Sequence, residues 1–259
     1  MAQQQDSGGR AELTLAVFVD FENLALGAQD LKGKRFDIEL VLKRLLEKGR
    51  IVAKRAYCDW TRYRQFMDEF HRNGFEMIDI PQTKISGKNS ADIRMVVDAV
   101  DLCYAKSHID AFALLTGDSD FSPLVSKLKE NDKRVIGCGV RNSTSNLLAA
   151  SCDEFIFYDD LVKVSQRPRT RAKKAKTSEQ QTALERVAET VESLSGEYDP
   201  LWGSLVKQTV RRVYPGFNET AYGYRSFSEL LEDAAKQGLL ELQFDKERGN
   251  YKVRSVGAE

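Results

Sequence analysis

The stretch AFALLTGDSDF, residues 111–121, joins a continuous apolar run to two carboxylates that are one residue apart. Such a run is typical of a parallel strand that is buried on both faces. Ligands of open α/β sheets bind beyond the carboxyl ends of such strands, which is where Asp118 and Asp120 stand. Residues i and i+2 of an extended chain point the same way, so the two carboxylates can project together. A plain turn rich in Gly, Asp and Ser explains this stretch equally well by itself.

The segments around this stretch alternate between strand and helix patterns. Short apolar runs occur at 15–20, 51–60, 75–81, 109–118, 134–140 and 154–162, and helix-length segments at 36–49, 61–74, 90–106, 122–132 and 142–152. This alternation predicts an α/β fold in which a mostly parallel, doubly wound sheet is covered by helices on both faces.

Composition bounds the class of protein. The chain has 259 residues and a hydrophobic fraction of 42%, which supports one large domain or two smaller ones with buried cores. No apolar stretch approaches the roughly 20 residues of a membrane helix, and the first residues lack the apolar core of a secretory signal. Four scattered cysteines without a CxxC pair, with only two histidines, disfavour structural zinc and favour a cytoplasmic protein with reduced thiols.

The net charge of zero conceals a basic segment, KVSQRPRTRAKKAKTS at 163–178, which has seven Lys or Arg and no acidic residue. Its low apolar content predicts a linker. The segment suits a phosphate backbone, although a merely solubilising tether fits as well. We therefore expect a disordered tail at 1–10, a first domain at 11–162, this linker, and a second domain at 179–256.

The second domain has a different pattern. Helical spacing is found at 182–194, 200–217 and 224–240, and residues 239–256 alternate like a β-hairpin. Three helices and a hairpin in fewer than 80 residues predict a small winged-helix arrangement.

Four acids of the first domain are candidates for one site. Asp20 ends the first predicted strand and Asp92 opens a helix, while Asp118 and Asp120 follow the fourth strand. The first and fourth strands of a doubly wound sheet can be neighbours at the topological switch point, so these carboxylates can meet. Their mutual repulsion is relieved by a divalent cation, and oxygen ligands favour Mg²⁺ or Mn²⁺.

Such a cation suits phosphodiester hydrolysis, because it activates a water molecule and stabilises the leaving oxygen. Asn23 can hold a metal-bound water or the substrate phosphate. Thr116 can bond a carboxylate or a phosphate, and Lys88 is a candidate phosphate contact, although an exposed loop lysine is more often simply solvated.

Three segments carry a family resemblance: FVDFENL, KNSADIRMVVD and LLTGDSDFSPLVSKLKENDKRVIGCGV. Over residues 13–162 they resemble, in order, the signatures of the NYN domain, and more closely the LabA-like branch of the PIN nuclease superfamily. The resemblance implies a metal-dependent ribonuclease, some members of the family having lost activity. By position it implies that Asp20, Asp92, Asp118 and Asp120 are the catalytic, metal-binding acids, with Asn23 beside them. The sequence departs from the usual pattern at 89–91 and at Thr116, and neither departure removes a carboxylate.

The segments YGYRSFSELLEDAAKQGLLEL and GNYKVR resemble the OST-HTH, or LOTUS, domain. This resemblance implies a module that binds RNA or, in some members, a protein partner. The candidate phosphate-contacting residues are Lys207, Arg211, Arg212 and Arg225. A solvated helix surface is the alternative interpretation of these four cations.

Three functions follow as hypotheses. The first is a Mg²⁺- or Mn²⁺-dependent endoribonuclease with a C-terminal RNA-binding module. The second is an RNA-binding adaptor whose nuclease fold no longer cuts. The third is a phosphatase of the haloacid-dehalogenase type. It is suggested by GDSD, but it needs a D-x-D motif at the first strand, where the chain has Asp20-Phe21-Glu22-Asn23. No heptad or exposed apolar stripe stands out in the sequence, so the oligomeric state stays open.

Overall fold

The computed structural model describes residues 13–29, 35–81, 89–165, 178–215 and 217–256. The chain divides into two compact units, Met1–Arg167 and Pro168–Glu259. The predicted tail at 1–10 and most of the predicted linker lie outside the described residues. Within those residues, no helix is long and apolar enough to cross a membrane.

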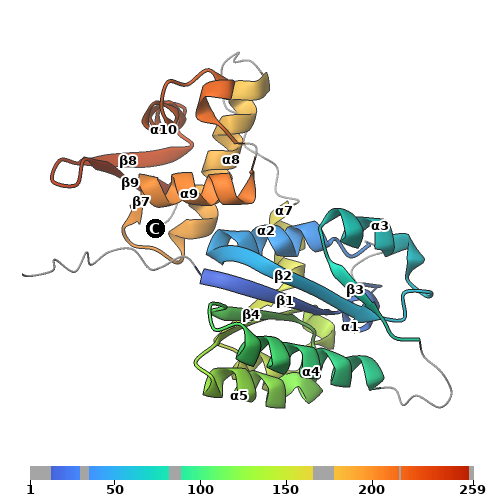
Figure 1. Cartoon of the computed structure of the whole chain (residues 1–259). Helices are drawn as coiled ribbons and strands as arrows, with labels where there is room; N and C mark the ends of the chain where they lie inside the picture. The colour runs from blue at the N-terminus through green and yellow to red at the C-terminus, as the bar shows by residue number, and fades with distance from the viewer. Residues whose placement is uncertain (1–12, 30–34, 82–88, 166–177, 216, 257–259) are drawn as a thin grey trace, which may run out of the picture. The chain divides into compact units, whose positions relative to one another are not determined.

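The N-terminal unit is built on a six-stranded parallel sheet (Figure 1). Its strands are β1 (Leu13–Asp20), β2 (Gly49–Cys58), β3 (Glu76–Asp79), β4 (Ala111–Leu115), β5 (Arg134–Gly139) and β6 (Glu154–Phe157). The strand order β3-β2-β1-β4-β5-β6 reverses direction between β1 and β4. The predicted α/β fold is therefore confirmed, and its switch point lies between these two strands.

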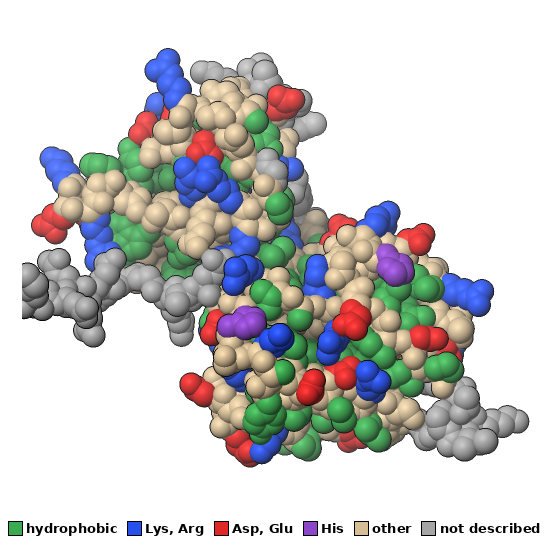
Figure 2. Space-filling model, in the orientation of Figure 1, with side chains coloured by type: hydrophobic (Ala, Val, Ile, Leu, Met, Phe, Trp, Pro, Cys, Tyr) green, Lys and Arg blue, Asp and Glu red, His purple; other side chains and the backbone are tan. Residues whose placement is uncertain are grey.

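Helices connect the strands and cover both faces of the sheet (Figure 1). They are α1 (Phe21–Gln29), α2 (Ile38–Lys48), α3 (Arg64–Arg72), α4 (Ser90–Ala105), α5 (Ser122–Glu130), α6 (Asn146–Ser151) and α7 (Tyr158–Ser165), with 3-10 turns η1 (Ser119–Phe121) and η2 (Arg141–Ser143). The sequence did not predict α1, because this helix begins at the residue after β1 with no turn residue between them. Figure 2 shows that some hydrophobic side chains remain at the surface between charged ones.

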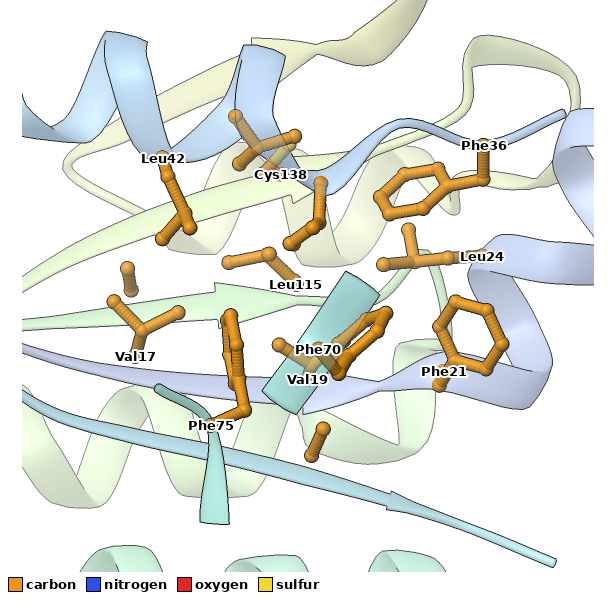
Figure 3. Close-up of a cluster of buried hydrophobic side chains, with 14 of the residues drawn as sticks. Val17, Val19, Phe21, Leu24, Phe36, Leu42, Phe70, Phe75, Leu115 and Cys138 are labelled. Atoms are coloured by element: carbon orange, nitrogen blue, oxygen red, sulfur yellow. The ribbon is translucent and has the colours of Figure 1, made fainter. Parts of the chain in front are cut away.

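The core lies on both faces of the sheet because side chains of β1 alternate between them. Leu15, Val17 and Val19 pack in one cluster with helix residues such as Leu24 and Leu42. Figure 3 shows this cluster, in which aromatic side chains from α1 and α3 lie beside the strands. The intervening residues, Ala16 and Phe18, pack on the opposite face, in a cluster that includes Met95 and Ala99 of α4. Because β1 is buried on both faces, the position of Asp20 at its end is fixed.

The C-terminal unit has its own core. It contains α8 (Ser178–Ser195), β7 (Leu201–Trp202), α9 (Gly203–Val213), the 3-10 turn η3 (Glu219–Tyr222), α10 (Phe227–Lys236), β8 (Leu240–Asp245) and β9 (Asn250–Ser255). The strands form an antiparallel sheet in the order β7-β9-β8. The helix predicted at 200–217 is shorter than expected, because Leu201 and Trp202 pair with Val253 and Lys252 of β9.

Candidate nuclease site

Asp20 and Asp118 come to the same edge of the sheet because β1 and β4 are parallel neighbours. Val19 is paired with Leu115, so each strand ends next to the other. Asp20 is the last residue of β1 and only 8% exposed. Asp118 follows β4 by three residues and is half-buried, while Asp120 is exposed. The edge is the carboxyl edge at the switch point, as the sequence predicted.

Thr116 links the carboxylate of Asp20 to the backbone of Asp118. Its hydroxyl donates a hydrogen bond to Asp20 Oδ2 at 3.0 Å and accepts one from the Asp118 N–H at 3.2 Å. The side chain is fully buried. Of the two roles that the sequence left open, a bond to a carboxylate and a bond to a phosphate, the structure contains the first. Burial and two hydrogen bonds make Thr116 a positioning residue.

Asn23 ties the start of α1 to the loop after β4. Its Oδ1 accepts a hydrogen bond from the Gly117 N–H at 2.8 Å, and its own backbone N–H donates to Asp20 Oδ1 at 3.3 Å. The bond from Gly117 uses one of the two lone pairs of the amide oxygen and fixes the orientation of the amide, whose NH₂ group offers two donors to a ligand.

The Asp118–Asp120 segment is a turn as well as a source of carboxylates. Asp118 Oδ1 accepts a hydrogen bond from the Asp120 N–H at 2.9 Å and caps η1. The extended backbone that the sequence predicted for Asp118–Asp120 is wrong, because Ser119–Phe121 form the 3-10 turn η1. The charges of both carboxylates nevertheless raise the pKa of Asp92.

The pKa values of two acids report that the carboxylates are close. Burial raises the pKa of Asp20 to about 7; hydrogen bonds from Asn23 and Thr116 oppose the shift, and the charges of Asp92 and Asp118 add to it. Burial also raises the pKa of Asp92, which opens α4, and the charges of Asp118 and Asp120 raise it further. Asp20 thus interacts electrostatically with Asp92 and Asp118, and Asp92 interacts with Asp118 and Asp120.

Glu22 is a fifth acid near the site, which the sequence analysis did not select. Its charge contributes to the raised pKa of Asp92, and its Oε1 lies 3.2 Å from Nη1 of Arg62. Glu22 stands in the first turn of α1. The sequence did not predict this helix, so it gave no reason to expect that Glu22 lies near the four acids.

The residues present fit a divalent cation by their chemistry. Asp20 is a buried carboxylate beside two other acids, and in the described part of the chain no Lys or Arg forms an ion pair with Asp20, Asp92, Asp118 or Asp120. Burying such charge without a cation is unfavourable. As the side chains stand, however, no group of three or more His, Cys, Asp or Glu among the described residues is arranged to hold a metal ion.

The predicted phosphate contacts differ in their surroundings. Lys88 lies outside the described residues. Lys207 and Arg211 converge on the buried carboxylate of Glu219, at 2.8 Å and 3.1 Å. Arg212 donates to the Thr209 hydroxyl at 3.3 Å, and Arg225 is exposed. The charge of Lys207 and Arg211 is thus partly neutralised by a residue that the sequence analysis did not consider.

Replacing Gly117 with Ala is expected to destabilise the N-terminal unit by about 1–3 kcal/mol through overpacking. A Cβ at Gly117 would lie 2.4 Å from the backbone oxygen of Ser143, and a backbone cannot move aside as a side-chain end can. The measurement is calorimetric unfolding of the full chain. Gly196→Ala is the matched control, because nothing lies within 4 Å of a Cβ there. An unshifted transition for Gly117→Ala would contradict this close approach of the two loops.

Comparison with known proteins adds three findings. A family model described as the NYN domain matches residues 14–159. An uncharacterized protein of Methanocaldococcus jannaschii is 28% identical over 167 residues, and the match covers 64% of this chain and 64% of that protein. The crystal structure of a protein of unknown function from Vibrio parahaemolyticus is similar with a TM-score of 0.52 and 25% identity, over 60% of this chain and 98% of that one.

Proposed function

Because this chain belongs to the NYN domain family, within the PIN-like nuclease superfamily, we propose that it is an endoribonuclease that depends on Mg²⁺ or Mn²⁺. The observation that carries the proposal is the position of buried Asp20 beside the end of β4, at the carboxyl edge of the sheet, where the charges of Asp92 and Asp118 act on it. Such a carboxylate set at a sheet's switch point suits phosphodiester hydrolysis better than phosphomonoester hydrolysis through an aspartyl nucleophile, for which the first strand lacks the motif.

The proposed roles follow from the contacts. Asp20, Asp92, Asp118 and Asp120 would hold the cation, whose chemistry would be to activate a water molecule and to neutralise charge on the phosphate. Thr116 holds the Asp20 carboxylate beside the backbone of Asp118 through its two hydrogen bonds. The NH₂ group of Asn23 contacts the phosphate or the attacking water, since its carbonyl oxygen is bound to Gly117. Attack in line leaves a 5′-phosphate and a 3′-hydroxyl.

The test is cleavage of single-stranded and folded RNA by the full chain, with Mn²⁺, with Mg²⁺ and with a chelator. We expect metal-dependent cleavage with 5′-phosphate ends, abolished by the chelator and by Asp118→Asn, because the substitution removes a charged ligand. Circular dichroism checks that the variant is folded. Full activity of a folded Asp118→Asn protein would contradict the proposal.

A catalytically silent RNA-binding adaptor is the second candidate. It is favoured by the finding that no three acidic, His or Cys side chains of the described residues are arranged around a metal position. RNA binding without cleavage under any of the metal conditions would select this alternative.

We propose that the C-terminal unit is a LOTUS-like module that recruits RNA, a protein partner being the alternative outcome. Its three helices and three-stranded sheet are compatible with a winged helix. A cytoplasmic setting is part of the proposal and is supported by four free cysteines.

Among the basic residues of this unit, we expect Arg225→Ala to weaken RNA binding more than Lys207→Ala. Glu219 already offsets much of the Lys207 charge, whereas Arg225 is an exposed cation. The measurement is binding to a fluorescent RNA at several salt concentrations, where loss of one phosphate contact lowers the salt slope by about 1. Lys236→Ala, another exposed cation, is the control. Equal effects at all three positions would contradict a localised contact.

A further inference from the structure

Helix α4 exposes three large apolar side chains on its outer face. Ile93, Val97 and Tyr104 are 63%, 56% and 62% exposed. The opposite face of the helix is buried against the sheet through Met95, Ala99 and Cys103. Figure 2 shows hydrophobic side chains next to acidic and basic ones over the part of the surface where Figure 1 has α4.

These side chains, with half-buried Val100, form one line along the helix, which we call the α4 stripe. The positions 93, 97, 100 and 104 are spaced by four, three and four residues. At about 100° per residue they fall within a sector of roughly 60°. Such a narrow apolar line is typical of two helices that pack against each other. A helix that packs on a domain core needs a wider apolar face.

Two opposite charges lie on the same side of the α4 stripe. Arg94 and Asp101 are both exposed and are seven residues apart, so they occupy equivalent angular positions two turns apart. Arg94 Nε also lies 3.0 Å from Asp98 of its own helix. The Asp98 side chain is only 15% exposed and also accepts a hydrogen bond from the Tyr57 hydroxyl, so this pair stays formed. The Arg94 side chain is 58% exposed, and its two Nη groups can donate to a second carboxylate.

The charges of Arg94 and Asp101 indicate which partner helix and which orientation the α4 stripe fits. When two copies of a helix pack antiparallel about a two-fold axis, the same flank of each helix faces its counterpart. Arg94 of each copy then faces Asp101 of the other. The same axis brings Ile93 opposite Tyr104 and Val97 opposite Val100, because both pairs are centred on the same point of the helix. In a parallel pair, this flank would instead face the apolar side on which Val96 lies.

We propose that the α4 stripe is a self-association surface, on which α4 of a second copy of this chain packs antiparallel to form a two-fold dimer. A 16-residue helix is about 24 Å long, so the contact is smaller than a standard interface and its dissociation constant is on the order of micromolar. Asp92 stands near the N-terminal end of α4. The two acidic sites would thus be near opposite ends of the helix pair, about 20 Å apart along its axis.

Sedimentation velocity of the full chain, without RNA, tests the proposal between about 1 and 200 µM. We expect a concentration-dependent monomer–dimer equilibrium. Val97→Glu should weaken it by about 100-fold, because the charge enters an apolar interface twice in a symmetric dimer. Leu147→Glu is the matched control, since Leu147 is 63% exposed on α6, and it should leave the equilibrium unchanged.

A charge exchange then tests the orientation. Arg94→Asp and Asp101→Arg should each weaken the dimer, and the double variant Arg94→Asp/Asp101→Arg should restore it. A monomer at every concentration, or a dimer that Val97→Glu leaves intact, would overturn the proposal. Failure of the double variant to recover would overturn the antiparallel arrangement. Circular dichroism of each variant verifies that the substitutions at these exposed positions leave the fold intact.

Discussion

Replacing Asp20 with Asn is expected to lower the rate of RNA cleavage by about 10³-fold and, at the same time, to stabilise the metal-free protein above pH 7. Asp20 is the most buried of the proposed ligands. A metal-bound site supplies several kcal/mol of transition-state stabilisation, and about 1.4 kcal/mol corresponds to a tenfold rate. Asn keeps the size of the side chain and, through its single amide oxygen, one of the two hydrogen bonds that Asp20 accepts from Thr116 and the Asn23 N–H. It removes the charge that burial disfavours, which is the larger effect above pH 7.

The opposite signs of the two effects separate a lost ligand from a damaged fold. A variant that loses activity because it unfolds would lose stability as well. Cleavage is measured under single-turnover conditions with Mn²⁺, and unfolding with a chelator present. Asp68→Asn is the matched control, because Asp68 is exposed on α3. An Asp20→Asn enzyme with undiminished cleavage would remove Asp20 from the site.

The sequence was sufficient to predict the edge where the acids meet. The apolar run before Asp118 and the run before Asp20 each predicted a buried parallel strand, and the pairing of β1 with β4 confirmed that the two are neighbours. What it could not supply was the local geometry. The hydrogen bond between Gly117 and Asn23 joins residues 94 positions apart, and no local pattern encodes such a contact.

Two features were hidden for different physical reasons. The α4 stripe was not recognised because α4 also has apolar residues on its inner face, and only the position of the sheet distinguishes Met95, which is buried, from Val97, which is exposed. The spacing of Lys207 and Arg211 was recognised as a cationic face. The carboxylate that binds both belongs to η3, eight residues beyond Arg211, where the sequence analysis had expected no structure.

The stability of the metal-free protein is expected to depend strongly on pH. In the metal-free protein, Asp20 is expected to make the free energy of unfolding fall as the pH rises from about 4 to 7. The folded state raises the pKa of this carboxyl from 3.8 to about 7, mainly through burial. Between these values the unfolded chain is ionised while the folded chain must hold a proton. The free energy of unfolding therefore falls by about 1.4 kcal/mol for each pH unit in this range, and the total decrease reaches about 4 kcal/mol above pH 7.

The difference between wild type and Asp20→Asn isolates this contribution, because other titrating groups are common to both proteins. Chemical denaturation with a chelator should give a difference near zero at pH 4 that grows to its full value by pH 7.5. Adding Mg²⁺ at 100 times its dissociation constant should raise the free energy of unfolding of the wild type by about 2.7 kcal/mol at pH 8. The same addition should change that of the variant little. The metal competes with the proton for the same carboxylate, so this recovery should vanish at acidic pH. A pH-independent difference between the two proteins would mean that Asp20 is ionised in the folded state without a cation, and the main physical reason for placing a metal there would be lost.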